Sequence, residues 1–274
     1  MVVDVSAWEV ISGEPGGRDA RKVWLSEVAD ADREEWWLWK PVKPTDRDAL
    51  RINDVAEVVA HRLADAIGLP AAPCEYARRG DERGAISRNI APKTHDMTAG
   101  STLVPPGDGY TVARILEALE GRTGPPPAHT DLTAAEVFAG YLVLDAWIGN
   151  TDRHEENWAV IERPDGSAYL APAYDHGSAL GSGMTDAKRE RRDRRAFCEG
   201  GRSSHFGGRS LVDMAREAVD LTGARWWVDR VAEVPASTWS GILDEHGALS
   251  GVSRSFVSDV LTINQGRVSE ACRP

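Results

Sequence analysis

Alternating apolar positions predict a β-rich beginning to the chain. The expected strands lie within residues 9–28, which read as strand, glycine-bearing turn and strand, and at residues 34–40, 75–77 and 84–90. In the segment 34–40 (EEWWLWK), strand alternation places Trp37 and Trp39 on one face. Lys40 then ends the opposite face, which it shares with Trp36 and Leu38.

Between these strands, residues 53–67 repeat apolar positions at helical spacing. The expected apolar stripe consists of Val55, Val59, Leu63 and Ala66. Asn53 or Asp54 is predicted to cap the N-terminus of this helix, and Gly68 to end it.

The second half of the chain reads mainly as helices. Thr133 and Glu136 form a capping box that opens a helix to Ile148, apolar on nearly all sides and therefore predicted to be buried. Two short strands follow at 158–162 and 167–170. Further amphipathic helices are expected at residues 211–221, 225–232, 237–244 and 253–270. The order of elements predicts an α+β fold.

Composition narrows the class of protein. The chain has 274 residues, 42% hydrophobic and 27% charged, which is enough for a full core in one large domain or two lobes. Its net charge of −11 argues against binding to nucleic acid or an anionic membrane. The three cysteines are too far apart for a disulfide framework or a zinc motif. The start lacks signal-peptide features and no apolar run could span a bilayer, so we expect a cytoplasmic protein.

The candidate chemistry lies in residues 145–177. Asp152 is followed by Asn157, then by the predicted hairpin, then by Asp175. Phosphoryl transfer from ATP needs a carboxylate that orients the acceptor hydroxyl, and oxygen ligands for the magnesium ions on the phosphates. Alternatively, Asp and Asn collect in loops because their side chains form local turns.

The residues and spacing of these motifs resemble those of a known family. Residues 150–157 (NTDRHEEN) resemble the D-R-H-x-x-N loop of phosphatidylinositol 3/4-kinase-like enzymes and HipA-like serine/threonine kinases, and residues 170–175 (LAPAYD) are closer to the HipA-like form. The resemblance implies that Asp152 is the catalytic acid/base and that Asn157 and Asp175 are magnesium ligands, with ATP as phosphate donor. The alternative from a different functional class is a pseudokinase, which keeps the fold but does not transfer phosphate.

This resemblance also implies a two-lobed protein-kinase-like fold with a small mixed β lobe and a larger helical lobe. We expect the β lobe at residues 1–90, a connector rich in Pro, Gly and Thr at 91–130, and the helical lobe at 131–274. Full-length HipA toxins carry a further N-terminal subdomain, for which this chain leaves no room. A toxin role with a DNA-binding antitoxin as partner therefore does not follow from the resemblance.

Lys40 and Glu57 are the candidates for the catalytic ion pair of the β lobe. Lys40 ends an apolar strand face, where a flexible cation can contact the α- and β-phosphates of a nucleotide. Glu57 precedes the run 63–69 (LADAIGL) by six residues, an offset from which, in HipA-like kinases, a Glu can pair with the strand lysine. Alternatively, Lys40 extends into solvent and Glu57 serves the first turn of its helix.

Two further segments are candidates for contact with the nucleotide. Ser12, Gly13 and Gly16 leave backbone N–H groups open to phosphates, and Ser12-Gly13 faintly resembles the S-G-x-Q-P-K loop of HipA-like kinases, although its Gln and Lys are absent. A plain hairpin turn is the alternative. The end of the strand at 84–90, with Ser87, Arg88 and Asn89, is expected to present its backbone to adenine.

A basic run, residues 188–195 (KRERRDRR), follows Asp175. It is either a solvated segment or a binding site for a phosphorylated or acidic substrate, since kinases carry an activation or substrate segment at this place. The acceptor of the phosphate stays open between a protein Ser/Thr hydroxyl and a small molecule or peptide, because ATP-binding motifs do not define it.

Overall fold

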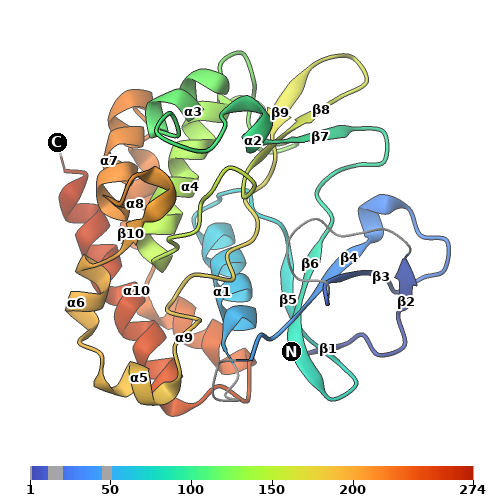
Figure 1. Ribbon diagram of the computed structural model, residues 1–274, viewed down its shortest axis with the longest axis vertical. Coiled ribbons are helices and arrows are strands. Elements are labelled where there is room, and N and C mark those ends of the chain that lie inside the picture. The colour runs from blue at the N-terminus through green and yellow to red at the C-terminus, as the bar shows by residue number, and fades with distance from the viewer. Residues whose placement is uncertain (1, 12–20, 45–50, 274) are drawn as a thin grey trace.

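The computed structural model describes residues 2–11, 21–44 and 51–273. A mixed six-stranded sheet lies beside a group of helices (Figure 1). The strands of this sheet are β1 (Val3–Asp4), β2 (Glu9–Ile11), β3 (Val23–Ser26), β4 (Trp37–Pro41), β5 (Cys74–Arg79) and β6 (Glu82–Arg88). Their order is β1-β5-β6-β4-β3-β2, with β1 parallel to β5 and the other neighbours antiparallel.

Strand β4 places Lys40 on the face of the sheet that meets the helices. Trp39 is 1% exposed and packs on the opposite face in a small core with Leu25 and Ile86, as the alternation predicts. The strand is shorter than expected at its start. Residues Arg33–Glu35 form a 3-10 turn, and the Trp36 indole donates to the Ala31 carbonyl, so Trp36 lies outside the strand.

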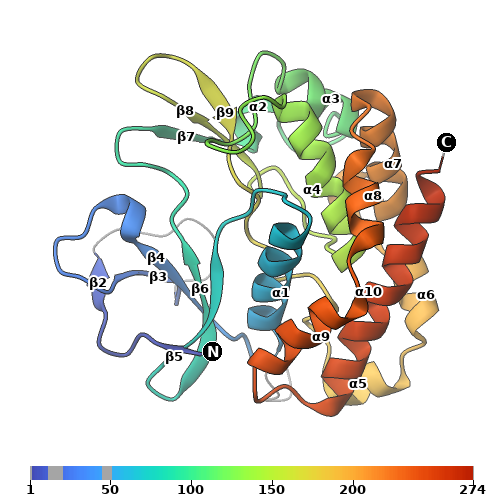
Figure 2. The same cartoon turned by 180° about the vertical axis from the view of Figure 1, so that it is seen from behind.

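Helix α1 (Asn53–Ala66) lies between the sheet and the other helices (Figures 1 and 2). The predicted N-cap is wrong. Ile52 occupies that position without a side-chain cap, because the Asn53 side chain accepts a hydrogen bond from the Lys43 N–H and Asp54 pairs with Arg83. The predicted single stripe is also too narrow, since nearly every residue up to Ala64 is buried, and it wrongly includes Ala66, which is exposed.

A second sheet of three antiparallel strands contains the predicted hairpin. Its strands are β7 (Asp96–Ala99), β8 (Ala159–Glu162) and β9 (Ala168–Leu170), in that order. Because β7 belongs to the expected connector and pairs with β8, the connector is built into this sheet. Two short helices, α2 (Gly100–Leu103) and α3 (Val112–Ala118), follow β7.

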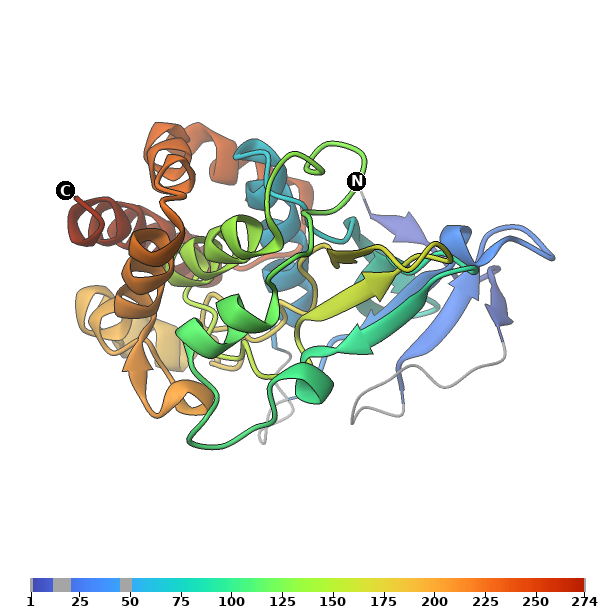
Figure 3. The ribbon, with the colours of Figure 1, turned by 90° about the horizontal axis from the view of Figure 1, so that it is seen from above.

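The remaining helices form the larger part of the molecule, and Figure 3 shows most of the strands gathered at the opposite end. They are α4 (Ala134–Ile148), α5 (Asp186–Arg191), α6 (Arg194–Glu199), α7 (Leu211–Thr222), α8 (Trp226–Glu233), α9 (Ala236–Glu245) and α10 (Gly251–Ala271). A small hairpin of β10 (Arg202–Ser203) and β11 (Arg209–Ser210) precedes α7.

Helix α4 is the central helix, and it begins and ends as predicted. The Thr133 hydroxyl and Glu136 carboxylate form both bonds of the capping box, and Gly149 ends the helix at φ 66° in the left-handed region. Nearly all of its residues are buried. This fixed end delivers the chain into the loop that carries Asp152. The predicted α+β class, with a small mixed β part and a larger helical part, is confirmed. Among the described residues, no helix combines the length and hydropathy needed to cross a membrane.

Candidate active site

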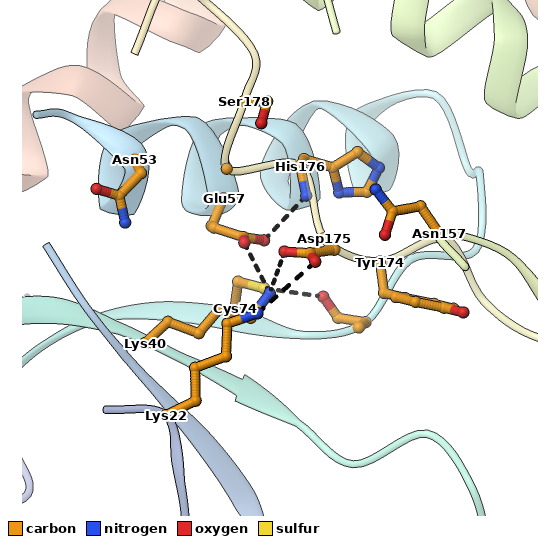
Figure 4. Close-up of polar contacts among 12 residues, drawn as sticks. Lys22, Lys40, Asn53, Glu57, Cys74, Asn157, Tyr174, Asp175, His176 and Ser178 are labelled. Carbon is orange, nitrogen blue, oxygen red and sulfur yellow. Dashed lines mark hydrogen bonds and ion pairs between the residues drawn. The ribbon is translucent and has the colours of Figure 1, made fainter. Parts of the chain in front are cut away.

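Lys40, Glu57 and Asp175 meet where β4 faces α1. The Lys40 Nζ lies 2.7 Å from the Glu57 Oε1 and 3.1 Å from the Asp175 Oδ1 (Figure 4). Lys40 and Glu57 are buried, whereas the side chain of Asp175 is 36% exposed. The Glu57 Oε2 also accepts from the His176 N–H at 3.2 Å. Glu57 therefore binds both the strand lysine and the backbone next to Asp175, which neither alternative interpretation explains.

The charges of this group depend on one another. Burial opposes the charge on Lys40, but Asp175 and Glu57 outweigh it and raise the Lys40 pKa. Lys40, together with Lys22, holds the pKa of the Asp175 carboxyl well below its usual range. Burial raises the pKa of Glu57, and the charge of Lys40 opposes this rise. At neutral pH the site thus holds a charged lysine and an ionised Asp175.

The backbone around Asp175 is fixed on both sides. The Ala173 N–H donates to the Pro70 carbonyl and the Ala72 N–H donates to the Ala173 carbonyl, which ties this segment to the chain after α1. Asp175 itself has φ 59°, a left-handed conformation that Asp adopts more readily than most residues. This conformation turns the carboxylate toward Lys40. Lys22, directly before β3, lies 3.8 Å from the other carboxylate oxygen.

The loop after α4 is built on a buried ion pair. Arg153 and Asp145 are each 1% exposed, and the guanidinium binds both carboxylate oxygens of Asp145 at 2.8 and 2.9 Å. Arg153 also donates to the Asn157 carbonyl and approaches the His176 Nε2 at 3.1 Å. Burial and the Arg153 charge keep the pKa of His176 well below its usual range, so His176 is neutral. This bidentate pair fixes the loop on the end of α4.

Asn157 and Asp152 contact each other through backbone and side chain. The Asn157 Nδ2 donates to the Asp152 carbonyl at 2.6 Å, so the amide oxygen of Asn157 takes no part in this hydrogen bond. Figure 4 shows the Asn157 side chain extending toward the segment that carries Asp175 and His176. Among the described residues, no group of three or more His, Cys, Asp or Glu side chains could hold a metal alone. One amide and one carboxylate fit an ion that takes its other ligands from phosphates and water.

The Asp152 carboxylate is held by two donors. The Ser178 Oγ lies 2.9 Å from the Asp152 Oδ2, and the His205 Nε2 lies 3.2 Å from the Oδ1. His154 is half-buried, and its Nδ1 accepts from the Glu156 N–H. This local role agrees with a structural histidine.

The predicted nucleotide contacts are only partly described. Ser12, Gly13 and Gly16 lie outside the described residues. Ser87 is buried in β6, and Arg88 donates to the Glu34 carbonyl. The Asn89 amide donates to the carbonyls of Arg33 and Ala91. The side chains of Arg88 and Asn89 therefore hold the turn before β4. Their backbone N–H groups donate to the carbonyls of Pro73 and Trp36, so only their backbone carbonyls stay candidates for adenine.

Three residues near the site were missed by sequence reasoning: Lys22, Ser178 and His205. Lys22 directly precedes a predicted strand close to the glycines, a signal that could have been used. Ser178 follows Asp175 by three residues, so its closeness to the motif was also a signal that could have been used. His205 comes 53 residues after Asp152 in a short turn without periodicity, so the sequence carried no signal for it.

The fold and the convergence of a strand lysine, a helix glutamate and two loop carboxylates define a kinase-like protein. The chain belongs to the HipA-like C-terminal domain family, whose family model matches residues 16–237. The family expected from the motifs is thus confirmed. A search of curated protein sequences found no match.

Two solved structures share the fold at low sequence identity. The proinflammatory kinase CtkA of Helicobacter pylori superposes with a TM-score of 0.75 and 15% identity, covering 99% of this chain and 97% of that chain. A chain of the Shewanella oneidensis MR-1 toxin–antitoxin complex of HipA, HipB and operator DNA gives a TM-score of 0.55 and 13% identity. That match covers 86% of this chain and 57% of that chain.

Proposed function

We propose that this protein is a kinase that transfers the γ-phosphate of ATP to a hydroxyl group, by family likeness that of a protein serine or threonine. The observation that carries this proposal is the contact of Lys40 with both Glu57 and Asp175, beside the loop that bears Asp152 and Asn157. The family, and the name of CtkA as a kinase, support the same class of reaction.

Lys40 is assigned to the phosphates of ATP, and Glu57 holds it in place. The ammonium is charged and lies between two carboxylates, one buried and one partly exposed. Because Glu57 stays paired with it on the buried side, Lys40 keeps a counter-charge when its exposed side meets phosphate oxygens. Glu57 is therefore a positioning residue for Lys40.

Magnesium is assigned to Asn157 and Asp175. The ionised Asp175 supplies a carboxylate and Asn157 a neutral oxygen, as magnesium bound to substrate phosphates requires. Magnesium bound with ATP neutralises charge on the phosphates. The role of the protein is to hold Asp175 ionised, through Lys40 and Lys22, and to orient Asn157 through the Asp152 carbonyl.

Asp152 is assigned to the acceptor hydroxyl. In the transfer, the hydroxyl proton passes to a carboxylate oxygen of Asp152 while the hydroxyl oxygen bonds to the γ-phosphorus. The bond from that phosphorus to the bridging oxygen breaks, and ADP leaves with its electron pair. Asp152 is 39% exposed, so an acceptor can reach it from solvent.

The remaining assignments follow the expected two lobes. We assign residues 1–90 to the nucleotide lobe, 91–130 to the connector and 131–274 to the catalytic lobe. Ser12, Gly13 and Gly16 are assigned to phosphate contact, and the backbone of Ser87, Arg88 and Asn89 to adenine. The net charge of −11 disfavours direct binding of nucleic acid, and we assign the reaction to the cytoplasm.

Incubation with γ-labelled ATP and magnesium, with and without a cell extract, tests the proposal. Label on this protein or on an extract protein supports transfer to a protein hydroxyl. Label in the small-molecule fraction moves the assignment to a small-molecule kinase. No transfer, together with binding of ATP, would identify a pseudokinase. The Asp152→Asn variant is the matched control for contaminating kinases.

A further inference from the structure

His205 contacts Asp152 from a part of the chain that no motif marks. It lies in the 3-10 turn Ser204–Phe206 between β10 and β11, and its Nε2 is 3.2 Å from the Asp152 Oδ1. Beside a carboxylate, this nitrogen must carry the hydrogen. The histidine ring also packs against the ring of His154 at a centroid distance of 5.1 Å. Contacts with two residues of the same loop orient the imidazole toward Asp152.

The turn that carries His205 is anchored to the catalytic loop. The neighbouring Phe206 is 3% exposed and packs against Tyr110, with ring centroids 4.7 Å apart. The Tyr110 hydroxyl donates to the Arg153 carbonyl and accepts from the Trp158 indole. Phe206 thereby links the turn to the residue directly after Asp152. The position of the turn that carries His205 is fixed by this buried chain of contacts, in addition to the contacts of the half-buried His205 ring itself.

The two donors on Asp152 restrict the carboxylate. Ser178 occupies one oxygen and His205 the other, and the two donors come from separate segments of the chain. An aspartate side chain with one donor can rotate about its terminal bond, whereas donors on both oxygens fix its plane. A fixed plane matters for a group that must accept a proton from a hydroxyl at hydrogen-bond distance.

We propose that His205 is a positioning residue for Asp152, which holds the carboxylate in the orientation that receives the proton of the acceptor hydroxyl. The proposal rests on the proposed function for the role of Asp152. It also places the hairpin of β10 and β11 beside the acceptor, because His205 borders the carboxylate that the acceptor must reach.

A pair of substitutions at one position tests this role. His205→Leu removes the donor and keeps apolar bulk, and His205→Gln keeps an N–H donor at a similar reach. With MgATP and water as the acceptor, we expect His205→Leu to lower kcat about tenfold, the value of one hydrogen bond to a charged group. The affinity for MgATP should stay unchanged, and His205→Gln should restore most of the rate. A purely structural role would not be rescued by the donor.

The same substitution in the Asp152→Asn background separates positioning from other effects. Without a carboxylate that can take the proton, His205→Leu should change the residual rate less than about twofold, because coupled residues are non-additive. An equal loss in both backgrounds, a wild-type kcat for His205→Leu, or no rescue by Gln would overturn the proposal.

Urea unfolding of the same four variants gives a readout that needs no activity. Non-additive unfolding free energies for His205→Leu and Asp152→Asn support the contact, and additive ones overturn it. If the wild type neither hydrolyses ATP nor transfers phosphate, the proposed function fails, and the unfolding data still decide whether His205 holds Asp152.

Discussion

At the scale of single residues, Lys40 is central to the charge balance of the site. It is the shared cation of two carboxylates, and Glu57 beside it is almost without solvent, at 3% side-chain exposure. Removing one partner of a buried ion pair leaves the other charge uncompensated, which costs more than the pair contributes. The lysine is therefore needed both for phosphate contact and for the folded state.

Lys40→Met should lower the free energy of unfolding by about 3–5 kcal/mol, because Glu57 would stay buried without its counter-charge. Adding Glu57→Gln should recover part of this loss, since a neutral amide needs no cation. Phosphate transfer should be absent from both variants. Urea unfolding and a transfer assay measure the two effects. A single variant as stable as the wild type would contradict the buried pair.

His61 on α1 predicts a pH dependence of stability. It is 7% exposed, and burial lowers its pKa below the usual 6.5, although the Asp65 carboxylate 3.4 Å from its Nε2 opposes this shift. The unfolded chain therefore binds a proton more readily than the folded one, so stability present above the unfolded pKa is lost as pH falls from there toward the lower folded pKa.

Unfolding free energies at pH 8 and pH 5.5 measure this effect. The wild type should lose stability over this range, and His61→Gln should lose less, because that variant has no imidazole to protonate. Equal slopes for the wild type and His61→Gln would show that His61 does not stay neutral.

At the scale of elements, the basic run after Asp175 divides into two kinds of residue. Arg189 on α5 is 1% exposed and binds the carbonyls of Gly181 and Ser182 as well as Ser253. It thus fixes the segment that follows Asp175 against α10. Arg191 and Arg192 are exposed. The expectation of a uniform solvated or substrate-binding run is wrong for Arg189, because its guanidinium lies inside the fold.

Arg189→Ala should lower the free energy of unfolding by about 3 kcal/mol, since it removes the hydrogen bonds of a buried, charged guanidinium to two carbonyls, Ser253 and Asp186. The double variant Arg191→Ser, Arg192→Ser is the matched control and should melt like the wild type. An effect on use of the acceptor is expected only for this double variant, and it should be larger at low salt, where charges are screened less. Equal melting temperatures for both variants would contradict the structural role of Arg189.

Local signals explain which elements the sequence could predict. Helix α4 was predicted at both ends because a capping box and a left-handed glycine are properties of neighbouring residues. The cap of α1 was predicted wrongly because Asn53, a good capping residue, gives its side-chain oxygen to the Lys43 backbone instead. Burial of α1 on nearly all sides was not predicted either, because it depends on helices far along the chain.

At the scale of the whole molecule, α1 joins the sheet to the C-terminal helices. Asp54, with no exposed surface, pairs with Arg83 on β6 and lies 3.3 Å from His246, directly after α9. Glu57 on the same helix holds the site together. The Lys40–Glu57 contact was predictable only through the family offset. The contact of Asp152 with His205 was not predictable, because folding alone brings these loops together.

The two carboxylates near the reacting atoms, Asp152 and Asp175, are assigned different tasks. Asp175 lies against Lys40 and Lys22, and Asp152 is held by Ser178 and His205. Asp175→Asn should therefore weaken binding of MgATP together with turnover. Asp152→Asn should keep binding and lose about 10²–10⁴ in rate, the usual contribution of a positioned acid/base.

Calorimetric titration of MgATP into both variants and the wild type, beside a phosphate-transfer assay, measures this difference directly. We predict near-normal affinity for Asp152→Asn with almost no transfer, and reduced affinity for Asp175→Asn. Near-normal transfer by Asp152→Asn, or wild-type affinity of Asp175→Asn for MgATP, would contradict these assignments.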